Sequence, residues 1–329
     1  MAQLVKLLDY ISRYENDLTR YPTQFLKLKK YHWQRMKIQW ETGALGAEDE
    51  TDYSEPIEEE KRQKKGFASL FRLFKQEKAP LEDEMDESAQ AVPDEFDFNP
   101  NIVYQPRTLS ELQRLYLDQL FHFQIKWASS TLMDTSKVAP KYMRDSLLRS
   151  FLQQLPDNYL LFYEPIIKIQ KAPIQLDIIL ISPLECICIT VLEEEDIAAF
   201  ASENNRFWIK RYGDREEKIL NPMLALNRMT KIVSQLFKEK ELEFPIRKCL
   251  ISRNGYIDYP MASYDLEVID RRSYEEWFHS LKNVSAPLKF NQFRAAQSIL
   301  DITESIAMSR LLEEEELKKG TLHEDEQDD

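Results

Sequence analysis

The first forty residues follow a helical pattern of apolar and polar positions. Four apolar residues near the start recur at helical spacing: Leu4, Leu7, Leu8 and Ile11. A second amphipathic stretch begins at about Arg20, and Pro22 is tolerated there because the first turn of a helix leaves its amides unpaired. The pattern therefore predicts helices over residues 2–40.

After residue 100 the chain alternates between helical and strand patterns. Helical periodicity predicts two or three helices over 108–155, and a last one over 290–318. Between them, a helix is predicted from the N-cap Asn221, and another at SYEEWFHSL, where Ser-x-x-Glu forms a capping box. Short apolar runs predict the strands: 159–170, 175–182, 186–192, 206–212, 247–252 and the segment LEVID. This order predicts an α/β (α+β) fold with a mixed sheet flanked by helices.

Charge divides the chain unevenly. The 329 residues carry a net charge of -13, yet residues 1–40 hold 8 bases and 3 acids, whereas residues 41–100 hold 18 acids and 7 bases. Composition and periodicity together predict these parts: a basic helical arm at 1–40, an acidic disordered linker at 41–100, a helical lead-in at 101–140, a folded domain at 141–282, a C-terminal helix at 283–318 and an acidic tail at 319–329.

The basic arm is the first candidate binding element. Bases and aromatic residues alternate along it: Lys27, Lys29, Lys30, Trp33, Arg35 and Lys37. Such a helix binds nucleic acid or lies at a membrane surface. The alternative is a solvated basic face whose aromatic side chains pack on the body of the protein.

A second candidate lies within the acidic linker, at residues 61–75. Four apolar residues follow a cluster of bases at helical spacing: Phe67, Leu70, Phe71 and Phe74. A short basic amphipathic helix suits a partner protein or an anionic membrane surface. Docking of this segment onto the chain itself is the alternative.

Composition excludes several other classes. There are only 6 glycines and no G-x-x-x-x-G-K-S/T, which argues against a phosphate-binding loop. No apolar stretch is long enough to span a bilayer, and the start does not read as a secretory signal, so we expect a cytoplasmic protein. Cys186 and Cys188 lie two apart without a nearby histidine, which predicts buried core residues rather than a zinc site.

The segment from Arg144 to Val191, RDSLLRSFLQQLPDNYLLFYEPIIKIQKAPIQLDIILISPLECICITV, resembles the nuclease-related domain (NERD). That family belongs to the restriction-endonuclease-like, PD-(D/E)xK superfamily. The resemblance extends from residue 142 to about 238, and residues 239–280 are expected to complete the fold. It implies a restriction-endonuclease-like sheet core and a metal-dependent nuclease site.

The motif positions implied by this resemblance are only partly kept. Gln175 and Asp177 match the family's Gln-x-Asp. Asp145 stands where the first helix carries a Glu, and Ala225 where the Asn-Pro helix carries a Gln. Thr190 and Leu192 replace both members of Glu-x-Lys. Phosphodiester hydrolysis with a bound Mg²⁺ needs carboxylate ligands for the metal and a positive group beside the attacking water. The loss of both members of Glu-x-Lys therefore predicts an inactive site.

The sequence thus predicts a catalytically inactive nuclease-like domain that acts as a binding or scaffolding module for a protein partner, and through its arm for nucleic acid. No cofactor or metal is expected. The alternative is a nuclease with migrated residues around Asp177, in which Mg²⁺ would bind. Glu164, Glu193, Glu194, Glu195, Lys168, Lys171 and Lys210 are the groups that could have replaced the lost pair.

Overall fold

The computed structural model describes residues 1–45, 98, 100, 105–131, 133–169, 172–194, 196–260 and 264–306. The chain divides into two compact units, one of Met1–Arg35 with Pro106–Asp329 and one of Met36–Gln105. The described part of the second unit holds the end of helix α1 (Arg20–Glu41), the residues just after it, and residues 98, 100 and 105. The amphipathic segment predicted at 61–75 lies outside the described residues.

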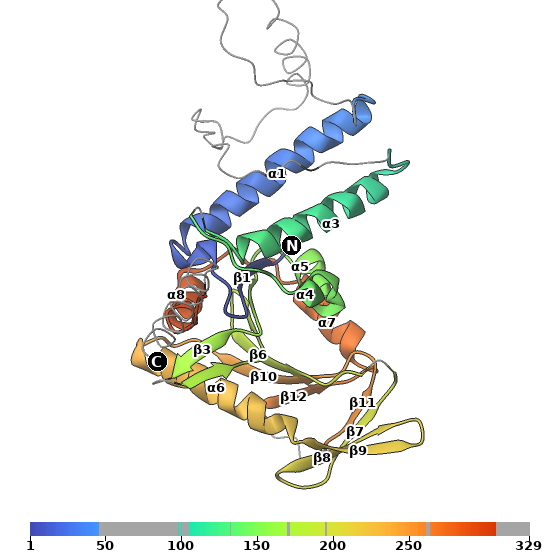
Figure 1. Cartoon of the computed structure of the whole chain (residues 1–329), viewed down its shortest axis with the longest axis vertical. Helices are drawn as coiled ribbons and strands as arrows, with labels where there is room; N and C mark the ends of the chain where they lie inside the picture. Colours follow the sequence, from blue (N-terminus) through green and yellow to red (C-terminus); the bar gives the residue numbers. More distant parts are fainter. Residues whose placement is uncertain are drawn as a thin grey trace, which may run out of the picture. The chain divides into compact units, whose positions relative to one another are not determined.

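A six-stranded mixed sheet forms the centre of the first unit (Figure 1). Its strands in spatial order are β1 (Gln3–Leu7), β2 (Leu160–Tyr163), β5 (Ile178–Ile181), β6 (Cys186–Val191), β10 (Ile246–Ile251) and β12 (Leu266–Ile269). The β2–β5 and β5–β6 pairs are antiparallel, and the other three pairs are parallel. The predicted mixed α/β fold is confirmed.

Continuous apolar runs place β2, β5 and β6 in the middle of this sheet. LLFY and IILI are buried at every position, and so are the first five residues of CICITV. Such runs suit strands that are covered on both faces. Cys186 and Cys188 are fully buried free thiols, as predicted.

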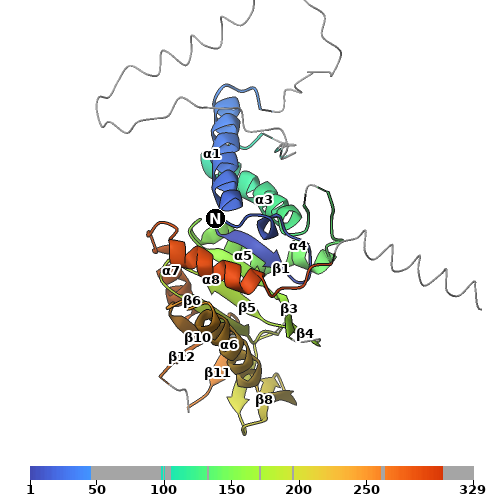
Figure 2. The same ribbon diagram turned by 90° about the vertical axis from the view of Figure 1, so that its left-hand side faces the viewer.

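Helices cover the sheet (Figures 1 and 2). Helix α6 (Pro222–Glu239) packs on β6 and β10, α8 (Phe290–Leu300) packs on β5, and α3 (Leu109–Trp127) packs on β1 and on α5 (Ser146–Gln154). Among the described residues, the remaining helices are η1 (Arg13–Glu15), α4 (Pro140–Arg144) and α7 (Tyr274–Lys282). The Asn221 side chain accepts a hydrogen bond from the amide of Met223, which confirms the predicted cap of α6.

Two smaller sheets complete the fold. One has four strands in the order β11 (Tyr256–Asp258), β7 (Ala199–Ser202), β8 (Phe207–Tyr212) and β9 (Arg215–Leu220). The other is the hairpin of β3 (Ile166–Ile169) and β4 (Ala172–Gln175). Of these strands, β4, β7, β9 and β11 were not predicted, since β9 is polar and exposed and the others are short.

The predicted helix over the first residues is wrong. Residues Gln3–Leu7 form β1, which is buried at every position and pairs in parallel with β2. Helical spacing of the leucines could not reveal this, because the pairing partner lies more than 150 residues away and burial on both faces removes the alternation typical of a strand. The helix predicted from Arg20 is confirmed as α1.

Three further boundaries differ from the prediction. The strand expected over 159–170 is split into β2 and β3 at Glu164, whose φ of 50° turns the chain. The last helix ends at Leu300, and residues 301–306 continue without helical structure. The capping box at Ser273 does not form, because its hydroxyl instead accepts a hydrogen bond from the amide of Asp270.

Candidate functional site

Asp177 and Thr190 lie opposite each other at one end of the β5–β6 pair. The register that pairs Ile178 with Ile189 continues by one residue to bring them face to face. The Thr190 hydroxyl donates a hydrogen bond of 2.5 Å to Oδ2 of Asp177. Thr190 stands at the position where the nuclease motif has a second carboxylate. Its neutral hydroxyl therefore forms a hydrogen bond with Asp177 in place of that carboxylate.

The environment of Asp177 disfavours its charged form. Burial raises the pKa of its carboxyl group, and the nearby charge of Glu164 raises it further. The hydrogen bond from Thr190 and the positive charge of Arg228 act in the opposite direction. The net effect is a raised pKa, which is unlike the strongly ionised carboxylate that a divalent cation prefers.

Glu164 is the second carboxylate next to this position. Its amide donates a hydrogen bond of 2.9 Å to the carbonyl of Asp177, which joins the end of β2 to the start of β5. Its Oε2 atom accepts hydrogen bonds from the hydroxyl of Tyr142 at 2.8 Å and from Nε2 of Gln175 at 3.3 Å. Lys141 lies 3.4 Å from the same atom. The remnant Gln175 thus contacts Glu164.

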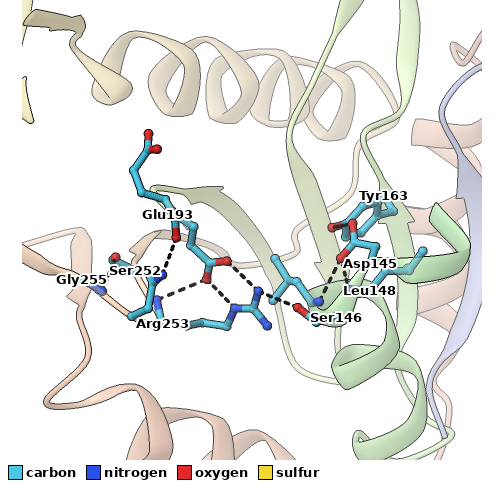
Figure 3. Close-up of polar contacts among 11 residues, drawn as sticks. Asp145, Ser146, Leu148, Tyr163, Glu193, Ser252, Arg253 and Gly255 are labelled. Atoms are coloured by element: carbon cyan, nitrogen blue, oxygen red, sulfur yellow. Dashed lines mark hydrogen bonds and ion pairs between the residues drawn. The ribbon is translucent and has the colours of Figure 1, made fainter. Parts of the chain in front are cut away.

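Asp145 has a structural role. Its Oδ1 atom accepts hydrogen bonds from the amides of Leu147 at 2.9 Å and Leu148 at 3.0 Å, and so caps α5. Its Oδ2 atom accepts a hydrogen bond of 2.6 Å from the hydroxyl of Tyr163 (Figure 3). With both oxygens engaged, this carboxylate fixes the start of the helix on β2.

An ion pair lies just beyond the end of β6. The guanidinium of Arg253, in the turn between β10 and β11, is paired with the carboxylate of Glu193, and its Nη2 atom lies 2.6 Å from Oε2 (Figure 3). The same Nη2 atom donates to Oγ of Ser146 at 3.1 Å. The hydrogen bonds with Glu193 raise the pKa of Arg253, and the carboxylate of Glu193 is already paired with this guanidinium.

The position of the missing lysine is apolar. Leu192 follows directly after β6, its side chain is half-buried, and its amide donates to the carbonyl of Ile251 at 2.7 Å. The two candidate lysines that the structure describes are paired elsewhere. Lys168 lies 3.3 Å from Glu304, and Lys210 lies 2.5 Å from Glu194 and 2.7 Å from Glu217. Lys171 and Glu195 lie outside the described residues.

Arg228 is the residue near this position that sequence reasoning missed. It lies on α6, three residues after Ala225, and is exposed. Since residues three apart share a helix face, its position beside the expected family glutamine was a signal that could have been used. Within the described part of the chain, no group of three or more His, Cys, Asp or Glu side chains could hold a metal ion.

Some side chains of the basic arm pack on the rest of the first unit, and others are exposed to solvent. Nζ of Lys29 lies 2.8 Å from Oδ2 of Asp157, and the half-buried ring of Trp33 lies 5.4 Å from that of Tyr116, between ring centroids. Lys27, Lys30 and Arg35 are exposed. Lys37 belongs to the other unit, where it lies 3.7 Å from Glu41.

The β5–β6 pair places Asp177 opposite Thr190, the position of the motif glutamate. Residues 142–252 match the nuclease-related domain. The match confirms the predicted resemblance and covers the strands from β2 to β10. The part of the chain before residue 142 contributes β1 to the same sheet without being part of the match.

One curated relative is similar to part of the chain. It is named "RNA 2',3'-cyclic phosphodiesterase", comes from Geobacillus stearothermophilus, and is 35% identical over 133 residues, which are 38% of this chain. The aligned region spans only 36% of that relative's length. No solved structure matches the chain. No helix in the described ranges is both long and apolar enough to cross a membrane.

Proposed function

We propose that the nuclease-related domain of this chain is catalytically inactive and acts as a binding or scaffolding module. The hydrogen bond from Thr190 to Asp177 is the observation that carries the proposal. This hydrogen bond pairs Asp177 with a neutral hydroxyl, at the position where a nuclease would have a second metal-binding carboxylate. Leu192 supplies no positive charge for the transition state of phosphodiester hydrolysis. The residues present therefore do not fit a catalytic Mg²⁺ site.

The three cysteines are free and buried, which suits the reducing cytoplasm that we propose as the compartment of this protein.

We propose that the partner of the module is a protein. The segment at 61–75 remains a candidate contact for a partner or a membrane surface.

A cleavage assay tests the proposed inactivity. Single- and double-stranded DNA and RNA are incubated with the full chain in Mg²⁺ or Mn²⁺, and RNA ending in a 2',3'-cyclic phosphate is added because of the name of the relative. We expect no divalent-dependent product from the wild type. Cleavage by the wild type that disappears in Asp177→Ala would overturn the proposal.

The alternative is a divalent-metal-dependent nuclease in which Glu164 replaces the lost carboxylate. It is favoured by one observation: Glu164 lies close enough to Asp177 for its charge to raise the pKa of the aspartate. Arg228, whose charge also acts on Asp177, would be the positive group. This alternative predicts that Glu164→Gln and Asp177→Asn abolish cleavage equally, whereas Glu203→Gln, in the turn between β7 and β8, leaves it unchanged.

A further inference from the structure

Helix α1 contains a long stretch without acidic residues. Between Leu18 and Trp40 there is no Asp or Glu, and there are 6 Lys and Arg residues, although the chain as a whole carries a net charge of -13. Such a local excess of one sign in an acidic chain indicates a surface for an anionic partner.

Packing uses one side of α1. Phe25 is fully buried and its ring centroid lies 5.7 Å from that of Trp127 on α3. Leu28 is also buried, and the hydroxyl of Tyr116 donates a hydrogen bond of 2.6 Å to the carbonyl of Lys29. The apolar side of the part of α1 that belongs to the first unit is thus covered by α3, beside which this part runs in Figure 1.

The other side of α1 is polar and exposed. It carries residues at helical spacing that we call the basic face: Lys27, Lys30, Tyr31, Gln34 and Arg35. Within the described residues, no carboxylate pairs with Lys27 or Lys30. Lys27 and Lys30 are one turn apart, where like charges repel unless an anion neutralises them. The face extends for about 12 Å along the helix axis, at a rise of about 1.5 Å per residue.

An exposed aromatic ring lies among these bases. Tyr31 is 53% exposed, and its ring meets that of His32 edge to face, with centroids 5.2 Å apart. The contact with His32 restricts the tyrosine ring, while the side chain stays accessible to solvent. Bases of unpaired nucleotides stack on rings of this kind, and lysines beside them contact the phosphates.

We infer that the basic face of α1 binds single-stranded nucleic acid, with Lys27 and Lys30 contacting phosphates and Tyr31 stacking on a base. A membrane surface fits this face less well, because a helix that lies in a membrane inserts its apolar side, and that side of α1 is covered by α3. Duplex nucleic acid fits less well because its bases are already stacked. The inference does not depend on whether the nuclease-related domain cleaves.

Binding is measured by fluorescence anisotropy with labelled oligouridylate, oligothymidylate and a duplex, using the full chain in EDTA so that metal-dependent cleavage cannot occur. We expect salt-sensitive binding that is stronger for the single strands. The double variant Lys27→Gln/Lys30→Gln removes two phosphate contacts, so the slope of log affinity against log salt should fall by about 1.4, at about 0.7 per contact.

Tyr31→Ala should weaken binding about 5- to 150-fold with little change in the salt slope, because it removes stacking and no charge. Tyr31→Phe keeps the ring and should retain the wild-type affinity. The matched control is Lys137→Gln/Lys238→Gln, which removes two exposed positive charges away from the basic face and should leave both affinity and slope unchanged.

Three results would overturn the inference. One is the absence of salt-sensitive binding to either single strand. Another is an equal loss in the control variant, which would indicate non-specific attraction. The third is flotation with anionic phosphatidylserine vesicles that depends on Lys27 and Lys30 while the oligonucleotides do not bind. None of these results bears on catalytic inactivity, which the cleavage assay tests separately.

Discussion

Asp177 is the residue at which the chemistry of a nuclease and that of this chain diverge. Its carboxyl group is half-buried and hydrogen-bonded to Thr190, and burial raises its pKa. A carboxyl group with a raised pKa in the folded state stabilises the fold at low pH, and this contribution is lost as pH rises through the folded pKa. At neutral pH the ionised Asp177 therefore destabilises the fold relative to its neutral form.

The variant Asp177→Asn should accordingly be more stable than the wild type at neutral pH, because the amide removes the buried charge and its oxygen still accepts from Thr190. The advantage should shrink as pH falls toward the ordinary pKa of an aspartate, about 3.9. Thermal unfolding followed by circular dichroism over this pH range measures the difference. A variant that is less stable than the wild type throughout would contradict the assignment.

Thr190 is the matching residue on β6. It is buried, at 6% exposed, and its hydroxyl is the donor to Asp177. Thr190→Val keeps the shape of the side chain and removes the donor, which should lower the free energy of unfolding by about 1–3 kcal/mol at neutral pH, because a buried acceptor loses its partner. Urea unfolding measures this loss, and Thr230→Val on α6, where the hydroxyl bonds only to the carbonyl of Leu226, serves as the control.

At the scale of elements, β1 shows that the first residues belong to the central sheet and do not form a separate helical arm. All five of its residues are buried, and it pairs with β2, which lies in the region that matches the nuclease-related domain. An external helical arm would tolerate changes on most of its surface, whereas a buried strand does not.

Leu7→Ala should therefore lower the free energy of unfolding by about 2–5 kcal/mol, as expected for a fully buried leucine. Leu184→Ala is the control, since Leu184 is 54% exposed, and its effect should stay within about 0.5 kcal/mol. Chemical denaturation of both variants separates the two cases, and equal small effects would argue for an arm outside the sheet.

At the scale of the whole first unit, a buried lysine joins β1 and η1 to the residues after α8, which are 299 positions away from it in the sequence. Nζ of Lys6 on β1 lies 2.5 Å from Oε1 of Glu15 on η1 and 2.6 Å from Oγ of Ser305 after α8. The hydroxyl of Ser305 also donates to the same Glu15 oxygen at 2.7 Å. The Lys6 side chain is fully buried, so its charge is compensated mainly by Glu15.

Lys6→Met should destabilise the unit by about 3 kcal/mol, because it leaves Glu15 without the cation that neutralises it. Ser305→Ala removes the two hydrogen bonds of this hydroxyl, to Lys6 and to Glu15, and should cost about 1–2 kcal/mol. The comparison of both variants by urea unfolding distinguishes loss of the ion pair from loss of the contact with the C-terminal segment. A neutral effect of Lys6→Met would mean that the pair contributes nothing to the fold.

The sequence by itself determined the strands β2, β5 and β6, the capped helix α6 and the family resemblance, because runs of buried apolar residues and local capping signals lie within a few positions of one another. It also determined that Thr190 and Leu192 replace the catalytic pair, since the motif is short and local. These features needed no knowledge of distant contacts.

Only the tertiary structure decided what surrounds Asp177 and where the first residues lie. Glu164, Arg228 and Lys6 take their roles from segments that are far apart in sequence, and a strand buried on both faces shows no periodicity of its own. Side-chain pairing across such distances follows from how the sheet is assembled, so local patterns of hydrophobic and polar residues do not encode it in a readable form.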